Sequence, residues 1–68
     1  MHLVVEIERE DDGRWLAEIA SMPGVLAYGA SREEAIARAE ALALRVLADR
    51  LEAGETGPDI ETVSFRAA

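Results

Sequence analysis

Residues 22–35 constrain the fold of this 68-residue chain more than any other stretch. They combine a Pro-Gly turn, a short apolar segment and the start of a helix. Pro23 and Gly24 suit the two central positions of a type II turn, where proline fixes φ and glycine accepts a positive φ. Residues 25–28 are then expected to form a strand, although their pattern does not decide which face points inward.

The long helix of the chain is expected to begin after Ser31. The Ser31 hydroxyl can cap free backbone N–H groups, and Glu34 stands three residues later, as in a capping box. The helix should reach about Ala53, because Gly54 favours a helix end and Pro58 prevents the helix from resuming. Such a helix is ~33 Å long, whereas a seven-residue strand is about 23 Å long. One end of the helix should therefore project beyond the sheet.

The sequence before this stretch predicts a β-hairpin. Residues 2–8 and residues 14–20 alternate apolar and polar side chains, and an acidic segment with a glycine separates them. The side chains expected to share the inner face are Leu3, Val5, Ile7, Trp15, Ala17 and Ile19. This arrangement requires a loop with an odd number of residues, because directly opposed residues lie on the same face.

Two loop lengths meet that requirement. A three-residue loop, 11–13, would use Gly13 for a positive φ but would place Glu6 opposite Glu18. A five-residue loop would instead place Glu8 opposite Arg14. Since like charges directly opposite each other are unfavourable, we favour the five-residue loop.

A closing strand is predicted over residues 60–66, with Val63 and Phe65 on one face. The whole chain, 1–68, is then one domain with the element order β-β-β-α-β. The expected fold is α+β, with a two-layer arrangement in which one long helix packs on one face of the sheet.

The helix is apolar on two sides. The stripe expected to cover the sheet contains Ala35, Ile36, Ala39, Leu42, Ala43, Val46 and Leu47. A second group lies roughly opposite and contains Ala37, Ala41, Leu44, Ala48 and Leu51. Exposed alanine costs a helix little, but Leu44 and Leu51 are large. We therefore expect a self-contact through this side of the helix. A chain this short buries only ~60% of its unfolded surface, so a homo-oligomer would also add stability.

Composition narrows the function classes. The chain has no Cys and one His, so neither a disulfide nor a Cys- or His-based metal site is expected. The net charge is −7 and there is no Lys, which argues against direct nucleic-acid binding. Acidity suits a basic protein partner, and it also serves solubility. Neither a membrane-spanning run nor a signal peptide is visible, so a cytoplasmic location is expected.

No catalytic constellation is visible. The segment Gly24 to Ser31 resembles a phosphate loop, but Ala30 stands where that motif needs lysine. Asp11 and Asp12 fit turn chemistry at the hairpin tip better than acid–base work. We therefore expect a protein that is not an enzyme and that has no cofactor.

The outer face of the predicted sheet mixes apolar and charged side chains. Its apolar members should be Val4, Leu16 and either Tyr28 or Leu26, and its polar members His2, Glu6 and Glu18. Such a face is a candidate partner surface. Scattered exposed apolar residues are the simpler alternative.

The order of these motifs resembles the HicB family of antitoxins and their small stand-alone relatives. The matching segments are Asp12-Gly13-Arg14-Trp15, then Met22-Pro23-Gly24-Val25, then Gly29-Ala30-Ser31-Arg32-Glu33-Glu34-Ala35. The first contains a turn glycine followed by an aromatic residue, and the second contains a Pro-Gly turn. The third contains a glycine, then the residue that caps the helix, and then two acidic residues and an alanine in the first turn of the helix. The resemblance covers about residues 2–50.

This resemblance implies a mainly antiparallel sheet under one helix, and assembly as a dimer or tetramer. It also implies a non-catalytic function, in which the domain binds and neutralises a small basic HicA-type toxin that cleaves mRNA. Full HicB antitoxins carry a C-terminal DNA-binding domain, and the 68 residues contain no counterpart of it. The alternative is an orphan HicB-like regulatory or structural domain with another protein, or a small ligand, as its partner.

Overall fold

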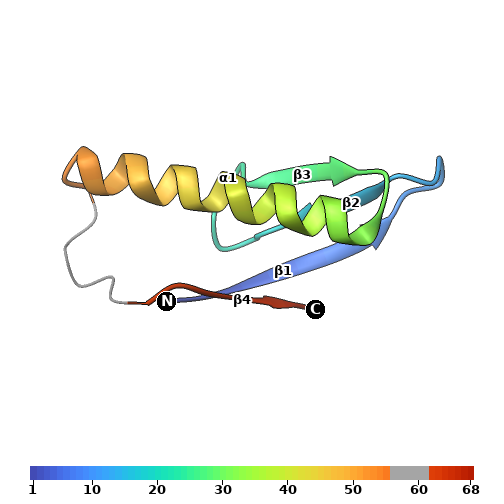
Figure 1. The fold of residues 1–68 in the computed structure, drawn as a ribbon, viewed down its shortest axis with the longest axis horizontal. Helices are drawn as coiled ribbons and strands as arrows, with labels where there is room; N and C mark the ends of the chain where they lie inside the picture. The colour runs from blue at the N-terminus through green and yellow to red at the C-terminus, as the bar shows by residue number, and fades with distance from the viewer. Residues whose placement is uncertain (56–61) are drawn as a thin grey trace.

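The computed structural model describes residues 1–55 and 62–68 and contains a four-stranded sheet and one helix (Figure 1). The elements are β1 (His2–Arg9), β2 (Trp15–Glu18), β3 (Leu26–Gly29), α1 (Arg32–Glu52) and β4 (Ser64–Ala67). The strand order is β3-β2-β1-β4, antiparallel except for the parallel pair β1–β4. The predicted two-layer α+β fold is confirmed. Of the strand predicted over 60–66, residues 60 and 61 lie outside the described part.

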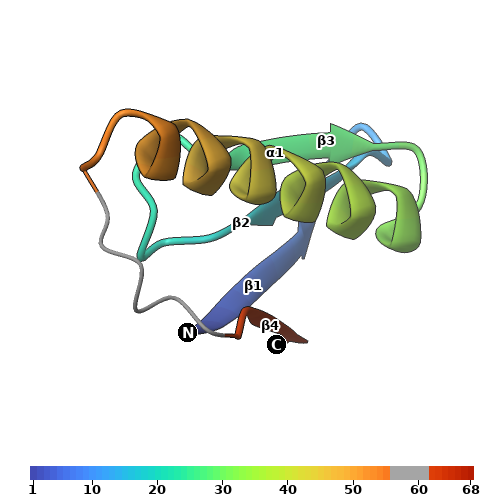
Figure 2. The same ribbon diagram turned by 60° about the vertical axis from the view of Figure 1, so that its left-hand side comes forward.

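Helix α1 covers one side of the sheet unevenly. It packs mainly on β3 and β2 and less on β1, whereas β4 lies at the far edge (Figures 1 and 2). Its C-terminal turns project past the ends of β2 and β3, as the difference in length predicts. The buried core lies between the layers and consists of Leu3, Val5, Ala17, Ile19, Met22, Val25, Ala35, Ala39, Ala43 and Leu47.

The hairpin uses the three-residue loop, so the preference for five residues is wrong. Glu6 lies opposite Glu18, and the Glu10 N–H donates to the Arg14 carbonyl oxygen at 2.7 Å. Gly13 has a φ of 90°, and the Arg14 N–H donates to Asp12 Oδ1 at 3.0 Å. These turn contacts outweigh the Glu6–Glu18 repulsion, because both carboxylates are exposed to water, which weakens the Coulomb interaction.

The turn before β3 and the turn after α1 both follow the predicted chemistry. Gly24 has a φ of 86°, and the Val25 N–H donates to the Met22 carbonyl oxygen at 3.0 Å, which closes the Pro-Gly turn. At the end of α1, the Gly54 and Glu55 N–H groups donate to carbonyl oxygens of the last helical turn. With Gly54 at a φ of 74°, this is the Schellman pattern.

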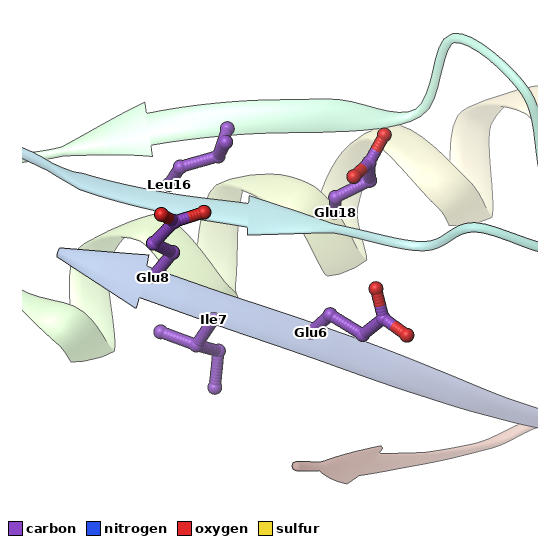
Figure 3. A pocket seen from close by; sticks show the side chains of 5 residues that line it. All are labelled: Glu6, Ile7, Glu8, Leu16 and Glu18. Atoms are coloured by element: carbon purple, nitrogen blue, oxygen red, sulfur yellow. The ribbon is translucent and has the colours of Figure 1, made fainter. Parts of the chain in front are cut away.

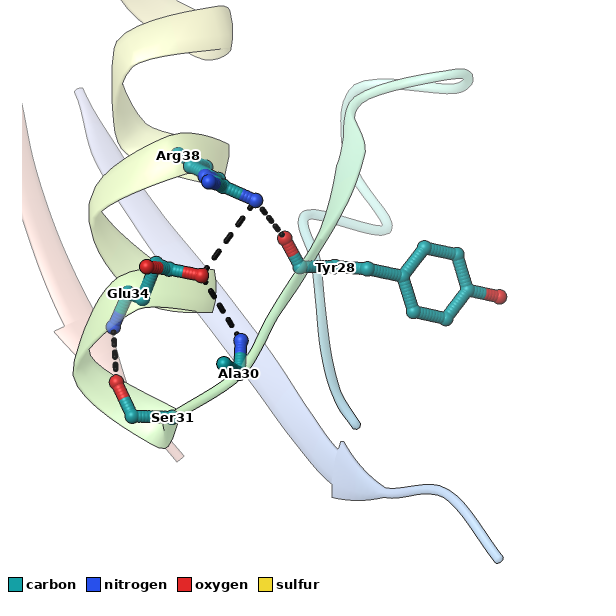
Figure 4. A network of polar contacts seen from close by, with 5 residues as sticks. All are labelled: Tyr28, Ala30, Ser31, Glu34 and Arg38. Carbon is teal, nitrogen blue, oxygen red and sulfur yellow. Dashed lines mark hydrogen bonds and ion pairs between the residues drawn. The ribbon is translucent and has the colours of Figure 1, made fainter. Parts of the chain in front are cut away.

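The start of α1 is tied to the edge strand β3 by a polar network (Figure 4). The Glu34 N–H donates to Ser31 Oγ at 3.1 Å, which is the predicted cap. Glu34 Oε1 accepts from the Ala30 N–H at 2.9 Å and lies 3.5 Å from Arg38 Nη1. Arg38 in turn donates to the Tyr28 carbonyl oxygen at 3.1 Å. One free carbonyl of the sheet edge is therefore occupied by a helix side chain.

Strand β3 faces the helix with its smallest side chains. Gly29 is buried, Ala27 is half-buried, and Leu26 and Tyr28 point to the opposite side and are exposed. A Cβ added to Gly29 would lie 2.5 Å from the backbone nitrogen of Ala35. Gly29 is therefore needed for close helix–sheet contact, a role that the sequence pattern did not reveal.

Candidate functional site

The side of the sheet opposite α1 is the first candidate surface, and we call it the outer sheet face. Its members are the apolar Val4, Leu16, Leu26 and Tyr28 and the acidic Glu6, Glu8 and Glu18. Leu26 and Tyr28 are 40% and 38% exposed, and the three glutamates are exposed. Since α1 packs on the other side, no described element covers this face.

The acidic members gather in a shallow depression across β1 and β2 (Figure 3). It has a volume of about 300 Å³ and is lined by Glu6, Ile7, Glu8, Leu16 and Glu18. Among the described residues, none of these three carboxylates has an ion-pair partner. Carboxylates without an ion-pair partner can accept hydrogen bonds from a bound molecule, and each can bind an arginine side chain through two parallel hydrogen bonds.

A cation lies at the hairpin end of the same face. The Arg14 guanidinium stacks over the Tyr28 ring, with its central carbon 4.4 Å from the ring centroid. Arg14 Nε also donates to Asp12 Oδ2 at 2.7 Å. The hydrogen bond from the Arg14 N–H, followed by that from the Arg14 side chain, lowers the pKa of Asp12 below its ordinary value. Arg14 is thus held by its own turn and supports Tyr28, so it does not neutralise the glutamates.

The far end of the outer sheet face is less acidic. His2 Nδ1 contacts Ser64 Oγ across the β1–β4 pair, and Arg66 lies beside Val4. The negative charge is therefore concentrated in the middle of the face, on β1 and β2.

The second candidate surface, which we call the outer helix face, lies on the other layer. It consists of Ala37, Ala41, Leu44, Ala48 and Leu51, all exposed. Leu44 and Leu51 are 49% and 45% exposed, which places them among the most exposed large apolar side chains of the described part. The opposite stripe is buried or half-buried as predicted, so these leucines have no role in the monomer core.

The residues predicted for interaction thus divide between two separate surfaces. Val4, Leu16 and Tyr28 lie on the outer sheet face, whereas Leu44 and Leu51 lie on the outer helix face. The residues predicted to be structural occupy turns, the helix cap or the packed layer between the sheet and α1: Gly13, Trp15, Pro23, Gly24, Gly29, Ser31, Glu34 and Ala35. The alternation of residues 2–8 puts Glu8 on the same face as Glu6, and the structure adds Glu8 to the acidic group as its third member.

The described residues show no grouping typical of metal binding, since no three His, Cys, Asp or Glu side chains there are placed to hold an ion. Across residues 1–55 and 62–68, α1 lacks the length of apolar sequence that a membrane crossing requires.

Comparisons of the chain with protein-family models, with characterised proteins and with solved structures give no match. The resemblance to HicB antitoxins therefore stays a prediction from the motifs.

Proposed function

We propose that this domain is a non-catalytic protein-binding module of the HicB antitoxin type, which neutralises a small basic HicA-type toxin. The observation that supports this proposal most is the outer sheet face. It offers apolar side chains next to three unpaired carboxylates, and no described part of the chain covers it.

The charges and the apolar side chains of the outer sheet face both favour a basic protein as the ligand. Glu6, Glu8 and Glu18 are part of the overall net charge of −7. This charge would speed the encounter with a cationic partner. Leu16 and Tyr28 supply the apolar contact that anchors such interfaces, in which aromatic residues contribute strongly. Neutralisation would follow if the bound face covers the basic RNA-binding surface of the toxin.

We also propose that the domain acts as a homo-oligomer in the cytoplasm, with the outer helix face as one self-contact. The support is the exposure of Leu44 and Leu51 on the layer opposite the proposed toxin surface. Because the two surfaces lie on opposite layers, self-association through α1 would leave the outer sheet face open to the toxin.

The test is binding to a HicA-type toxin, with variants that map the surface. Glu6→Gln with Glu18→Gln removes two charges from the outer sheet face, and we expect affinity to fall about 2- to 30-fold, from ~0.2–1 kcal/mol for each exposed ion pair. Tyr28→Ala should weaken binding by about tenfold or more, as for a central aromatic contact.

The matched control is Glu33→Gln with Glu52→Gln, which removes the same two charges from exposed positions on α1. It should leave the affinity within about twofold, because only long-range attraction changes. Equal losses in the two double variants would contradict the assignment of the outer sheet face. Absence of any complex with the wild-type domain would contradict the proposed function itself.

A further inference from the structure

The two edges of the sheet differ in how their backbone groups are used. At the β3 edge, Arg38 occupies the Tyr28 carbonyl oxygen, and α1 lies close above the strand. At the β4 edge, no described residue contacts the outward backbone groups, since β4 pairs only with β1. An unprotected edge strand is a template for pairing with another chain.

The hydrogen bonds to β1 show which groups of β4 are free. The Ser64 and Ala68 N–H groups donate to the Met1 and Val5 carbonyl oxygens, each at 2.9 Å. Successive residues of a strand point their backbone groups to alternate sides in the sheet plane. The N–H and C=O groups of Phe65 and Ala67 therefore point away from β1, towards the open edge.

The side chains near this edge suit a second copy of the chain. Val63 and Phe65 are half-buried on the inner side. Arg66 is the sole charged side chain in the segment 62–68. The strand therefore brings no acidic side chain to a self-contact, although the chain as a whole is acidic.

We infer that two copies pair antiparallel through β4, with a two-fold axis at Phe65. In this register Phe65 faces Phe65 of the second copy, Ser64 faces Arg66, and Val63 faces Ala67. Every outward backbone group from 63 to 67 then meets an outward group of the other copy. The register shifted by one position would place the two Arg66 side chains opposite each other, and like charges there are unfavourable.

The pairing would create a continuous eight-stranded sheet with both helices on the same side. It uses neither the outer sheet face nor the outer helix face, so it is independent of the proposed toxin surface. If the outer helix face also self-associates, the two contacts together would give a tetramer when their two-fold axes are perpendicular and intersect.

Hydrogen exchange on the unmodified protein tests the pairing without any substitution. We expect the Phe65 and Ala67 amides to exchange about tenfold or more slowly than in an unstructured chain, and faster when the protein is diluted. In a single copy, the Ser64 and Ala68 amides would be protected and the Phe65 and Ala67 amides would not. That alternating pattern would overturn the inference.

The substitution Ala67→Pro tests the same pairing by removing one of the backbone donors that it needs. Proline at position 67 removes an N–H that points to the open edge and leaves the hydrogen bonds of Ser64 and Ala68 to β1 in place. We expect the native mass to halve while the circular dichroism spectrum stays that of the folded protein. Ala67→Gly keeps the N–H and should keep the mass. A folded Ala67→Pro variant of unchanged mass would overturn the proposal.

Cysteine cross-linking tests the register, since the chain has no Cys of its own. Opposed residues of a hydrogen-bonded antiparallel pair have Cα atoms about 5.5 Å apart, which a disulfide can span. Phe65→Cys should therefore cross-link readily under mild oxidation, and Arg66→Cys should not. The opposite result would assign the shifted register and contradict ours.

Discussion

Replacing Gly29 with alanine tests how closely α1 must approach the sheet. The added Cβ would lie 2.5 Å from the Ala35 nitrogen, 2.9 Å from its Cα and 3.0 Å from the Glu34 carbonyl carbon. All three are backbone atoms, so no side-chain rotation can relieve the contact. The first turn of the helix would have to move by about 1 Å to reach ordinary contact, and a gap of that size forfeits up to about half of the dispersion energy along the interface.

The expected cost is large for a domain of this size. Overpacking of a well-packed site typically costs ~1–3 kcal/mol, and we expect about 3 kcal/mol here because the obstructing atoms are backbone. A 68-residue domain is stable by only ~3–10 kcal/mol. At about 4–8 °C per kcal/mol, the melting temperature should fall by about 12–24 °C.

Thermal and urea unfolding followed by circular dichroism measure this effect. Gly13→Asn is the control, because Gly13 has open space around it and a φ of 90°, which asparagine tolerates. It should cost less than about 1 kcal/mol. Adding Ala35→Gly to Gly29→Ala should not restore stability, since the clash involves the Ala35 backbone. A Gly29→Ala variant as stable as Gly13→Asn, or rescue by Ala35→Gly, would refute the close-approach argument.

Three further predictions concern the cap, the hairpin turn and the helix surface. Ser31→Ala should destabilise the domain by about 0.5–2 kcal/mol in urea unfolding, because the Glu34 N–H loses its acceptor; an unchanged midpoint would count against the cap. Since the pKa of Asp12 is lowered in the folded state, its stabilising effect is present above the unfolded pKa of ~3.9 and is lost as the pH falls further. Asp12→Asn should therefore lower the melting temperature near neutral pH but differ little from wild type at low pH, and a difference that persists in acid would disagree. Leu44→Glu with Leu51→Glu should reduce the native mass in light scattering if the outer helix face is a self-contact, and a folded double variant of wild-type mass would refute it.

Most of the fold followed from local rules in the sequence. The turn at Pro23-Gly24, the cap at Ser31 and the stop at Gly54 all match, because each depends on residues within one turn of the chain. The buried stripe of α1 also matches, because its period is set by helix geometry. These features locate the start and end of α1 within about one residue.

One prediction, the hairpin register, was wrong, and two other features of the fold could not be predicted. The hairpin register was predicted from the Glu6–Glu18 repulsion, which is weak in water, whereas the turn geometry at Gly13 decided it. The inward face of β3 could not be predicted, because it depends on how closely α1 can approach Gly29. The parallel pairing of β4 with β1 could not be predicted either. These two strands are separated in the sequence by β2, β3 and α1, and no local pattern relates them.

Local periodicity in the sequence also predicted part of the candidate surfaces. Alternation along β1 and β2 placed Val4, Leu16 and the glutamates on one face, and the helical period placed Leu44 and Leu51 together. The stacking of Arg14 on Tyr28 required the three-strand register and could not be predicted from the sequence.

Cleavage of RNA by a HicA-type toxin, with and without this domain, tests the proposed function most directly. We predict that one domain per toxin abolishes cleavage at low salt and that protection weakens as salt rises. Tyr28→Ala together with Glu6→Gln and Glu18→Gln should restore cleavage. Full cleavage in the presence of excess folded wild-type domain would contradict the proposed function.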